Sequence, residues 1–139
     1  MDNHICRAKD ITTGEWVYGY YVAVPEEYGQ GELVHAIFDP NECEHICGGE
    51  YIDYGWHEVD PDTVCRYTGL NDKQGNPIFE GDIITARYVD DGRLTKGVVN
   101  FLNGCFCVKY DNYNNPAMDM LYEYEIPGNV FDNTELMEE

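Results

Sequence analysis

The chain has 139 residues, of which 43% are hydrophobic and 14% aromatic, and its 27 acidic residues against eight Lys and Arg give a formal net charge of -19. This length suits one domain or two small subdomains, and the apolar content favours folding over intrinsic disorder. The acidic charge opposes binding to phosphate backbones and to acidic membrane surfaces, and it favours either solubility or a basic partner.

The sequence contains no long apolar run, and its first residues lack the basic-then-apolar order of a signal peptide. We therefore expect a cytoplasmic protein. In that compartment its six cysteines are expected to be free thiols rather than a disulfide framework.

Short stretches of alternating apolar and polar residues, separated by turn signals, predict a mostly β protein built as a sandwich or barrel. In the first half, the predicted strands are 6–9, 15–24 and 33–38. Residues 39–55 are acidic and have low helix and strand propensity, so an irregular loop is expected there. An N-cap followed by proline then predicts one helical turn over residues 61–64.

The second half predicts a meander of antiparallel strands. Asn103-Gly104 is a strong signal for a two-residue hairpin turn, and alternation over 118–126 predicts that Tyr122 and Tyr124 share one strand face. The predicted strands are 65–68, 82–89, 94–101, 105–110 and 118–126. Val130 and Phe131 are expected to close the barrel, and the residues predicted in or near its core are Ile78, Ile84, Val98, Phe101, Phe106, Val108, Tyr122 and Val130.

One long motif carries a family resemblance. Residues 67–84, YTGLNDKQGNPIFEGDII, closely resemble the YTGLxDxxGxxIxEGDI signature of the YopX family. Residues 7–20, 59–64 and 128–136 are similar, in the same order, to other segments of that family, although Thr134 replaces a proline common in its ending. The resemblance covers almost the whole chain.

The resemblance implies a fold and an origin. It implies an α+β or β-rich N-terminal subdomain, taken as residues 1–64, followed by an SH3-like β-barrel over 65–139. It also implies that a phage or prophage encodes the protein. The family offers no established catalytic residue to carry over, and the segment 39–55 departs from its pattern.

The residues exclude several enzyme classes. The chain contains no serine, which removes every serine-based catalytic triad, and it has no glycine-rich phosphate-binding motif. No spacing pairs a cysteine with His35, His45 or His57 as nucleophile and base. We therefore expect no enzyme activity and no cofactor, while a small cysteine-dependent enzyme stays an alternative.

The sharpest metal hypothesis is a zinc site at Cys43, His45 and Cys47, since zinc prefers thiolate and imidazole ligands. Structural zinc sites usually need two such ligand pairs, so free thiols are the preferred interpretation. The segment Glu80-Gly81-Asp82 is interpreted as structural, because its acids can accept backbone hydrogen bonds.

Twelve tyrosines stand among acidic residues, and tyrosine suits wet protein interfaces. Tyr110, Tyr113, Tyr122 and Tyr124 are the candidate interaction residues. We expect a non-catalytic interaction module that binds a basic or neutral protein and no nucleic acid, with a homo-oligomer left open. An acidic decoy that imitates DNA is the alternative, and Lys73, Arg87, Arg93 and Lys96 form the one basic cluster that opposes this view.

Overall fold

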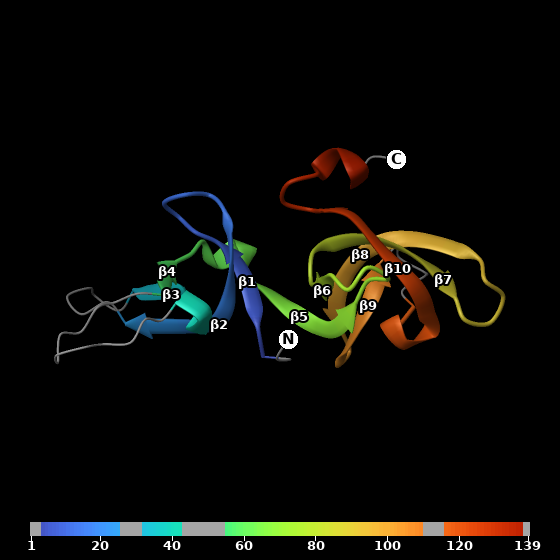
Figure 1. Cartoon of the computed structure of the whole chain (residues 1–139), viewed down its shortest axis with the longest axis horizontal. Coiled ribbons are helices and arrows are strands. Elements are labelled where there is room, and N and C mark those ends of the chain that lie inside the picture. Colours follow the sequence, from blue (N-terminus) through green and yellow to red (C-terminus); the bar gives the residue numbers. More distant parts are fainter. Residues whose placement is uncertain (1–3, 26–31, 43–54, 110–115, 138–139) are drawn as a thin grey trace. The chain divides into compact units, whose positions relative to one another are not determined.

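The computed structural model describes residues 4–25, 32–42, 55–109 and 116–137, and these residues are mostly β (Figure 1). The chain divides into an N-terminal unit, residues 2–66, and a C-terminal unit that begins at Tyr67. In the described parts of the chain, no helix has the length and apolar character needed to cross a membrane.

The N-terminal unit is built on an antiparallel sheet with the hydrogen-bonded order β4-β3-β2-β1-β5. Only the first two residues of β5 belong to this unit, and they pair with the start of β1. The strands are β1 (Cys6–Lys9), β2 (Trp16–Pro25), β3 (Leu33–Phe38), β4 (Trp56–Glu58) and β5 (Cys65–Asn71).

Two 3-10 helices connect these strands. η1 (Pro40–Glu42) opens the segment that was expected to be irregular, and the rest of that segment, 43–54, lies outside the described residues. η2 (Pro61–Thr63) confirms the predicted helical turn, because the side chain of Asp60 accepts the backbone N–H of Asp62 at 3.0 Å and so caps its first turn.

The two faces of the N-terminal sheet differ sharply because side chains alternate along each strand. One face forms the core of the unit around the fully buried Ala8 and Ile37, together with Val59. Val17 and Tyr21 pack against this cluster from β2. The even-numbered residues of β2 therefore project from the opposite face.

The C-terminal unit contains a four-stranded antiparallel sheet with the order β10-β7-β8-β9. The short strand β6 lies outside this sheet and pairs with the end of β5. The elements are β6 (Pro77–Phe79), β7 (Asp82–Tyr88), β8 (Leu94–Leu102), β9 (Cys105–Lys109), η3 (Met118–Met120), β10 (Leu121–Asn129) and η4 (Thr134–Met137).

The predicted mostly β character is confirmed, but the sheet of the C-terminal unit is open rather than closed into a barrel. Within the described residues, β9 has β8 as its only strand partner, and on its other side Cys107 forms a single bridge with Ala117. β10 pairs only with β7 in the described sheet. Val130 and Phe131, which were expected to close the barrel, lie in a turn after β10.

The core of the C-terminal unit confirms Ile78, Ile84 and Val108, which are fully buried. Phe101 and Tyr122 were predicted in the core, and this was wrong because they are 38% and 40% exposed. Tyr122 faces outward because β10 is bulged: its register with β7 shifts after Tyr122, and Glu123 has a φ of 53°. The bulge breaks simple alternation, so Leu121 is buried and Tyr124 is partly buried.

Candidate functional site

A row of aromatic side chains crosses the exposed face of the N-terminal sheet. Tyr20 on β2 lies opposite Phe38 on β3, and Phe38 lies opposite Trp56 on β4. The rings of Phe38 and Trp56 are in contact, with centroids 4.9 Å apart and a tilt of 43°. Together with Tyr18, two positions before Tyr20 on β2, these residues define what we call the aromatic face.

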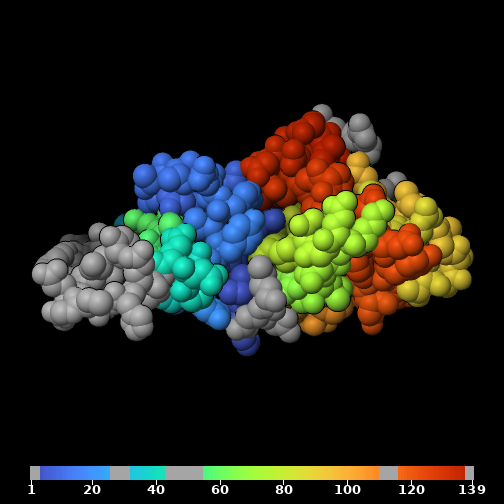
Figure 2. Space-filling model, in the orientation of Figure 1, coloured from blue at the N-terminus to red at the C-terminus, as the bar shows by residue number. Residues whose placement is uncertain are grey.

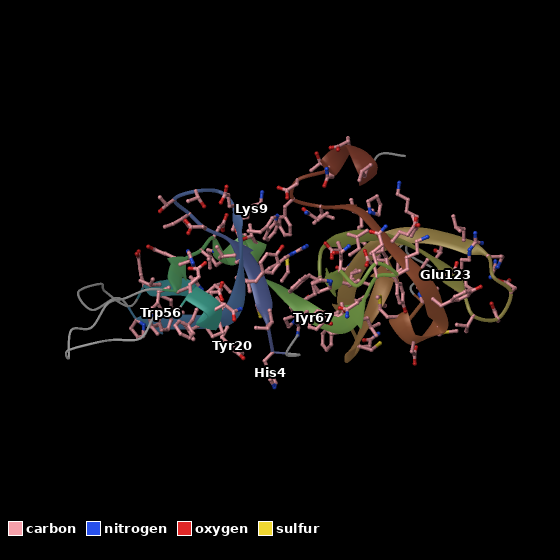
Figure 3. The ribbon with its side chains drawn as sticks, viewed as in Figure 1. His4, Lys9, Tyr20, Trp56, Tyr67 and Glu123 are labelled. Atoms are coloured by element: carbon pink, nitrogen blue, oxygen red, sulfur yellow. The ribbon has the colours of Figure 1, made fainter. Side chains whose placement is uncertain are left out.

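The aromatic face is open to solvent even though it is built from large rings. Tyr18 is 41% exposed, Tyr20 36% and Trp56 42%, while Phe38 is partly buried between its neighbours. Figure 2 shows β2 and β3 as adjoining surfaces of this unit, and Figure 3 labels Tyr20 and Trp56 near these strands. Val24, on the same face of β2, extends the apolar area and is 48% exposed.

Two basic side chains near this face, those of Arg7 and Lys9, lie over the ring of Trp16. Trp16 lies opposite Lys9 in the sheet, and the Lys9 ammonium is 5.3 Å from the ring centroid. The Arg7 guanidinium lies over the same ring at 4.5 Å. These are the two basic residues among the first 60, which contain 13 acids. The first 60 residues are therefore acidic overall, although both of their basic residues lie on this face.

The opposite face carries a histidine between two carboxylates. Nδ1 of His57 on β4 lies 3.0 Å from Oδ2 of Asp10, in the turn after β1, and Nε2 lies 2.7 Å from Oε2 of Glu42 in η1. Burial lowers the pKa of His57, but the hydrogen bonds and charges of Glu42 and Asp10 outweigh it and hold the pKa above its ordinary value. Hydrogen bonds from the backbone of Thr12 and from His57 hold the pKa of Asp10 below its ordinary value.

Neither this histidine nor His35 is placed beside a thiol in the described residues. His35 stacks on Tyr21, with ring centroids 5.9 Å apart, and its Nδ1 shares a hydrogen bond with the Tyr21 hydroxyl. Burial raises the pKa of the Cys107 thiol, which disfavours the reactive thiolate. No cluster of three or more metal-ligating side chains occurs among the described residues.

A polar groove of about 500 Å³ lies in the C-terminal unit, beside the loop from Asp72 to Asn76. The loop is fastened to β10 because the backbone N–H of Lys73 donates to the carbonyl of Tyr124 at 3.1 Å, and the Lys73 side chain pairs with Glu125. The residues that line the groove are Asp72, Lys73, Gln74, Asn76, Thr85, Glu125, Ile126 and Pro127.

The long motif at 67–84 has a structural explanation. Asp72 accepts the backbone N–H groups of Gln74 and Asn76 at 2.9 and 2.8 Å, and Gly75 has a φ of 89° that the turn requires. The buried carboxylate of Asp82 accepts the N–H of Phe79 at 2.8 Å. Because these polar groups satisfy the backbone of two tight turns, the motif specifies chain reversal.

The candidate residues from the sequence are placed as follows. Tyr122 is exposed, whereas Tyr124 is partly buried and its hydroxyl donates to the carbonyls of Leu121, at 2.9 Å, and Met118. The others, Tyr110, Tyr113, Cys43, His45 and Cys47, lie outside the described residues.

The sequence reasoning missed the aromatic face. A signal for it was present, since Trp16, Tyr18 and Tyr20 alternate along one strand and must share a face. The sequence does not show whether another layer of structure would bury these rings. The sequence also does not show which residues of β3 and β4 complete the row of rings, because these strands are separated from β2 along the chain.

The family model for the YopX protein matches residues 6–138. The chain belongs to the YopX family. The crystal structure of protein yopX from Bacillus subtilis is similar, with a TM-score of 0.56 and 19% identity over 99% of this chain and 98% of that one. Protein EF1440 from Enterococcus faecalis has a TM-score of 0.52 and 23% identity over 95% and 96%. The comparison with curated proteins gives no match.

These two structures share the fold of this chain across nearly their full lengths. Fold alone does not fix function, which resides in particular surfaces and sites. For this YopX-family chain, the features that bear on function are the aromatic face, the acidic net charge and the hydrogen-bonded histidines His35 and His57.

Proposed function

We propose that this YopX-family chain is a non-catalytic protein-interaction module, encoded by a phage or prophage and acting in the cytoplasm. The aromatic face carries the proposal. It lies in the proposed N-terminal subdomain, residues 1–64, and the proposed second subdomain, 65–139, contains the open antiparallel sheet β10-β7-β8-β9. Tyr122 on β10 is a second exposed tyrosine that a large partner could also contact.

Protein interfaces draw most of their energy from a few aromatic side chains that become desolvated on binding. Tyrosine and tryptophan suit this role because each combines a large apolar ring with one polar group, at a low cost in side-chain entropy. On the aromatic face, Tyr20 and Trp56 stand on either side of Phe38, so a partner would cover a continuous row of rings. A row of this kind favours a protein ligand.

Charge indicates the chemistry of the partner. The net charge of -19 attracts a basic surface over long range and accelerates its association, and a neutral partner is tolerated. A second copy of the chain carries the same charge and is repelled at low salt. We therefore favour a different, basic or neutral protein over a homo-oligomer.

Direct binding to nucleic acid is disfavoured because three of the four cations in the basic cluster are paired with carboxylates. Arg87 Nε lies 3.4 Å from Glu123 Oε2, Arg93 pairs with Asp91 at 2.5 Å, and Lys73 pairs with Glu125. Each phosphate contact requires a cation that is available to the backbone. The paired side chains of this cluster would have to break their ion pairs with carboxylates before they could contact phosphates.

The acidic decoy of a DNA-binding protein is the second candidate function, and the net charge favours it. It is separable from the first because a decoy depends on carboxylates rather than rings. Its binding would be abolished by moderate salt and would survive loss of the aromatic face.

The proposal is tested by capturing partners from a host lysate and measuring affinity with the purified partner. The variant Tyr20→Ala/Trp56→Ala removes two rings of the aromatic face, and Val89→Ala/Leu94→Ala removes two exposed apolar side chains of the C-terminal unit, 59% and 64% exposed, as a matched control. We expect the first variant to weaken binding by about tenfold or more and the control to leave it unchanged. Equal affinities for both variants would contradict the proposal, and binding lost only with salt would favour the decoy.

A further inference from the structure

The histidine on β4 has both of its ring nitrogens directed at carboxylates, at 3.0 Å for Asp10 and 2.7 Å for Glu42. A carboxylate only accepts hydrogen bonds, and a neutral imidazole has a single N–H. Both contacts can therefore be hydrogen bonds only when His57 is protonated. The side chains of His57 and Asp10 are 23% and 12% exposed, so water screens this pair less than it screens a surface ion pair.

These contacts join three segments that are separate along the chain. Asp10 belongs to the turn between β1 and β2, Glu42 to η1, and His57 to the three-residue edge strand β4. β4 has only β3 as a strand neighbour in the described sheet, so it depends on additional bonds. Two of these are the N–H of Asp39 donating to the carbonyl of Gly55 at 2.8 Å and the N–H of Ile11 donating to that of Glu58 at 3.0 Å.

We propose that Asp10, His57 and Glu42 form a pH-responsive latch that fastens β4 to the rest of the N-terminal unit. Protonated His57 closes the latch, and loss of its proton opens one of the two contacts and loosens β4. Since Trp56 is the neighbour of His57 on β4 and projects to the opposite face, the latch also sets the position of Trp56. Only the consequence for docking rests on the proposed function, because the latch itself is a property of the fold.

The groups around the imidazole support this assignment. Among the residues that the structure describes, the charged groups that face it are Asp10 and Glu42. From β3 its partner is the apolar Ile37, and His35, which shares that face of β3, is bonded to Tyr21. Glu58 is adjacent on β4 and projects to the other face of the sheet.

The pH range in which the latch is closed follows from the pKa shifts of His57 and Asp10. The pKa of His57 is raised in the folded chain, so its stabilising contribution is complete below the unfolded pKa and is lost as the pH rises through the folded pKa. The pKa of Asp10 is lowered, so its contribution is present above its unfolded value and is lost as the pH falls through the folded pKa. The latch is therefore closed between these two values and opens on the alkaline side when His57 deprotonates.

Nuclear magnetic resonance tests the latch without any partner. The titration of the His57 ring, the Trp56 indole N–H shift and the exchange protection factors of the Asp39 and Ile11 amides are followed across the neutral and alkaline range. We expect all of these signals to change with one midpoint, above that of an ordinary histidine. Protection is expected to fall by about tenfold for each unit by which the pKa of His57 is raised.

Two charge-neutralising variants separate the latch from a general charge effect. Glu42→Gln removes one arm, so the midpoint is expected to move to lower pH, whereas Glu58→Gln removes a charge from the same strand on the other face and is expected to leave it unchanged. Asp10 is not substituted in this test, because its carboxylate also accepts the backbone N–H groups of Thr12 and Thr13 in the turn. The latch is ruled out if His57 titrates without any step in Asp39 and Ile11 protection, or if both variants shift its midpoint equally. If the latch signals behave as expected while Tyr20→Ala/Trp56→Ala still binds the captured partner, only the docking function fails.

Discussion

The carboxylate of Asp82 accepts the backbone N–H of Phe79 at 2.8 Å, and both residues are almost completely buried. The two residues flank Glu80-Gly81, where the chain turns from β6 into β7, and Gly81 has a φ of 82°. A buried N–H that loses its acceptor leaves a desolvated donor, which costs more than an ordinary surface hydrogen bond. The EGD segment is therefore a structural turn.

Replacing this carboxylate should destabilise the C-terminal unit. We expect Asp82→Ala to lower the free energy of unfolding by about 1–3 kcal/mol, because the Phe79 N–H is left without this acceptor. Asp82→Asn keeps one oxygen and should cost less. Urea denaturation measures both, and Asp119→Ala, at an exposed acid, is the control. An Asp82→Ala variant as stable as this control would show that the turn does not depend on the carboxylate.

Gly19 on β2 is a second structural requirement. A Cβ placed on Gly19 would collide with the carbonyl oxygen of Phe38 and lie 2.6 Å from its carbonyl carbon. Because these are backbone atoms of the paired strand, they cannot move aside as a flexible side chain would. Gly19→Ala is expected to cost about 2 kcal/mol or more. Val24→Ala on the same strand, at a position 48% exposed, should cost far less, and thermal unfolding compares the two.

The turn of the hairpin between β8 and β9 requires positive φ at both of its central residues. Asn103 and Gly104 have φ values of 52° and 83°, as a type I′ turn requires. A Cβ on Gly104 meets nothing within 4 Å, so Gly104→Ala should cost only the strain of positive φ, about 1 kcal/mol. Asn103→Gly should be nearly neutral. A cost for Gly104→Ala as large as that for Gly19→Ala would contradict this distinction.

Nucleic-acid binding is the direct challenge to the proposed charge complementarity. In a gel-shift titration at low salt, we expect no micromolar binding to duplex or single-stranded DNA, because Lys73, Arg87 and Arg93 of the basic cluster are paired with carboxylates. Arg87→Glu and Arg93→Glu serve as probes. Micromolar binding by the natural chain that either substitution abolishes would refute the expectation.

Local features of this fold could be predicted from the sequence because their causes are local. The Asn103-Gly104 turn, the helical turn capped by Asp60 and the strand Leu33–Phe38 each depend on residues within a few positions of one another. The strand β4 was missed because three residues are too few to show a period and its stability comes from β3.

The remaining errors have long-range causes. Alternation predicted that Tyr122 and Tyr124 share one face of β10, but the bulge at Glu123 leaves Tyr122 exposed while Tyr124 packs against the core. The His57 latch joins residues 47 and 15 positions apart, and nothing in the spacing of Asp10, Glu42 and His57 indicates that they meet. Such contacts depend on how the strands pair, which periodicity does not specify.

The central claim is that the aromatic face docks a protein, and a footprint of the complex tests it most directly. Chemical shifts of the labelled chain are recorded with and without the captured, purified partner. We expect the largest changes at Tyr18, Tyr20, Phe38 and Trp56, together with protection of the Trp56 indole N–H. A footprint that leaves these four residues unchanged and lies entirely on acidic side chains or on the C-terminal unit would contradict the account.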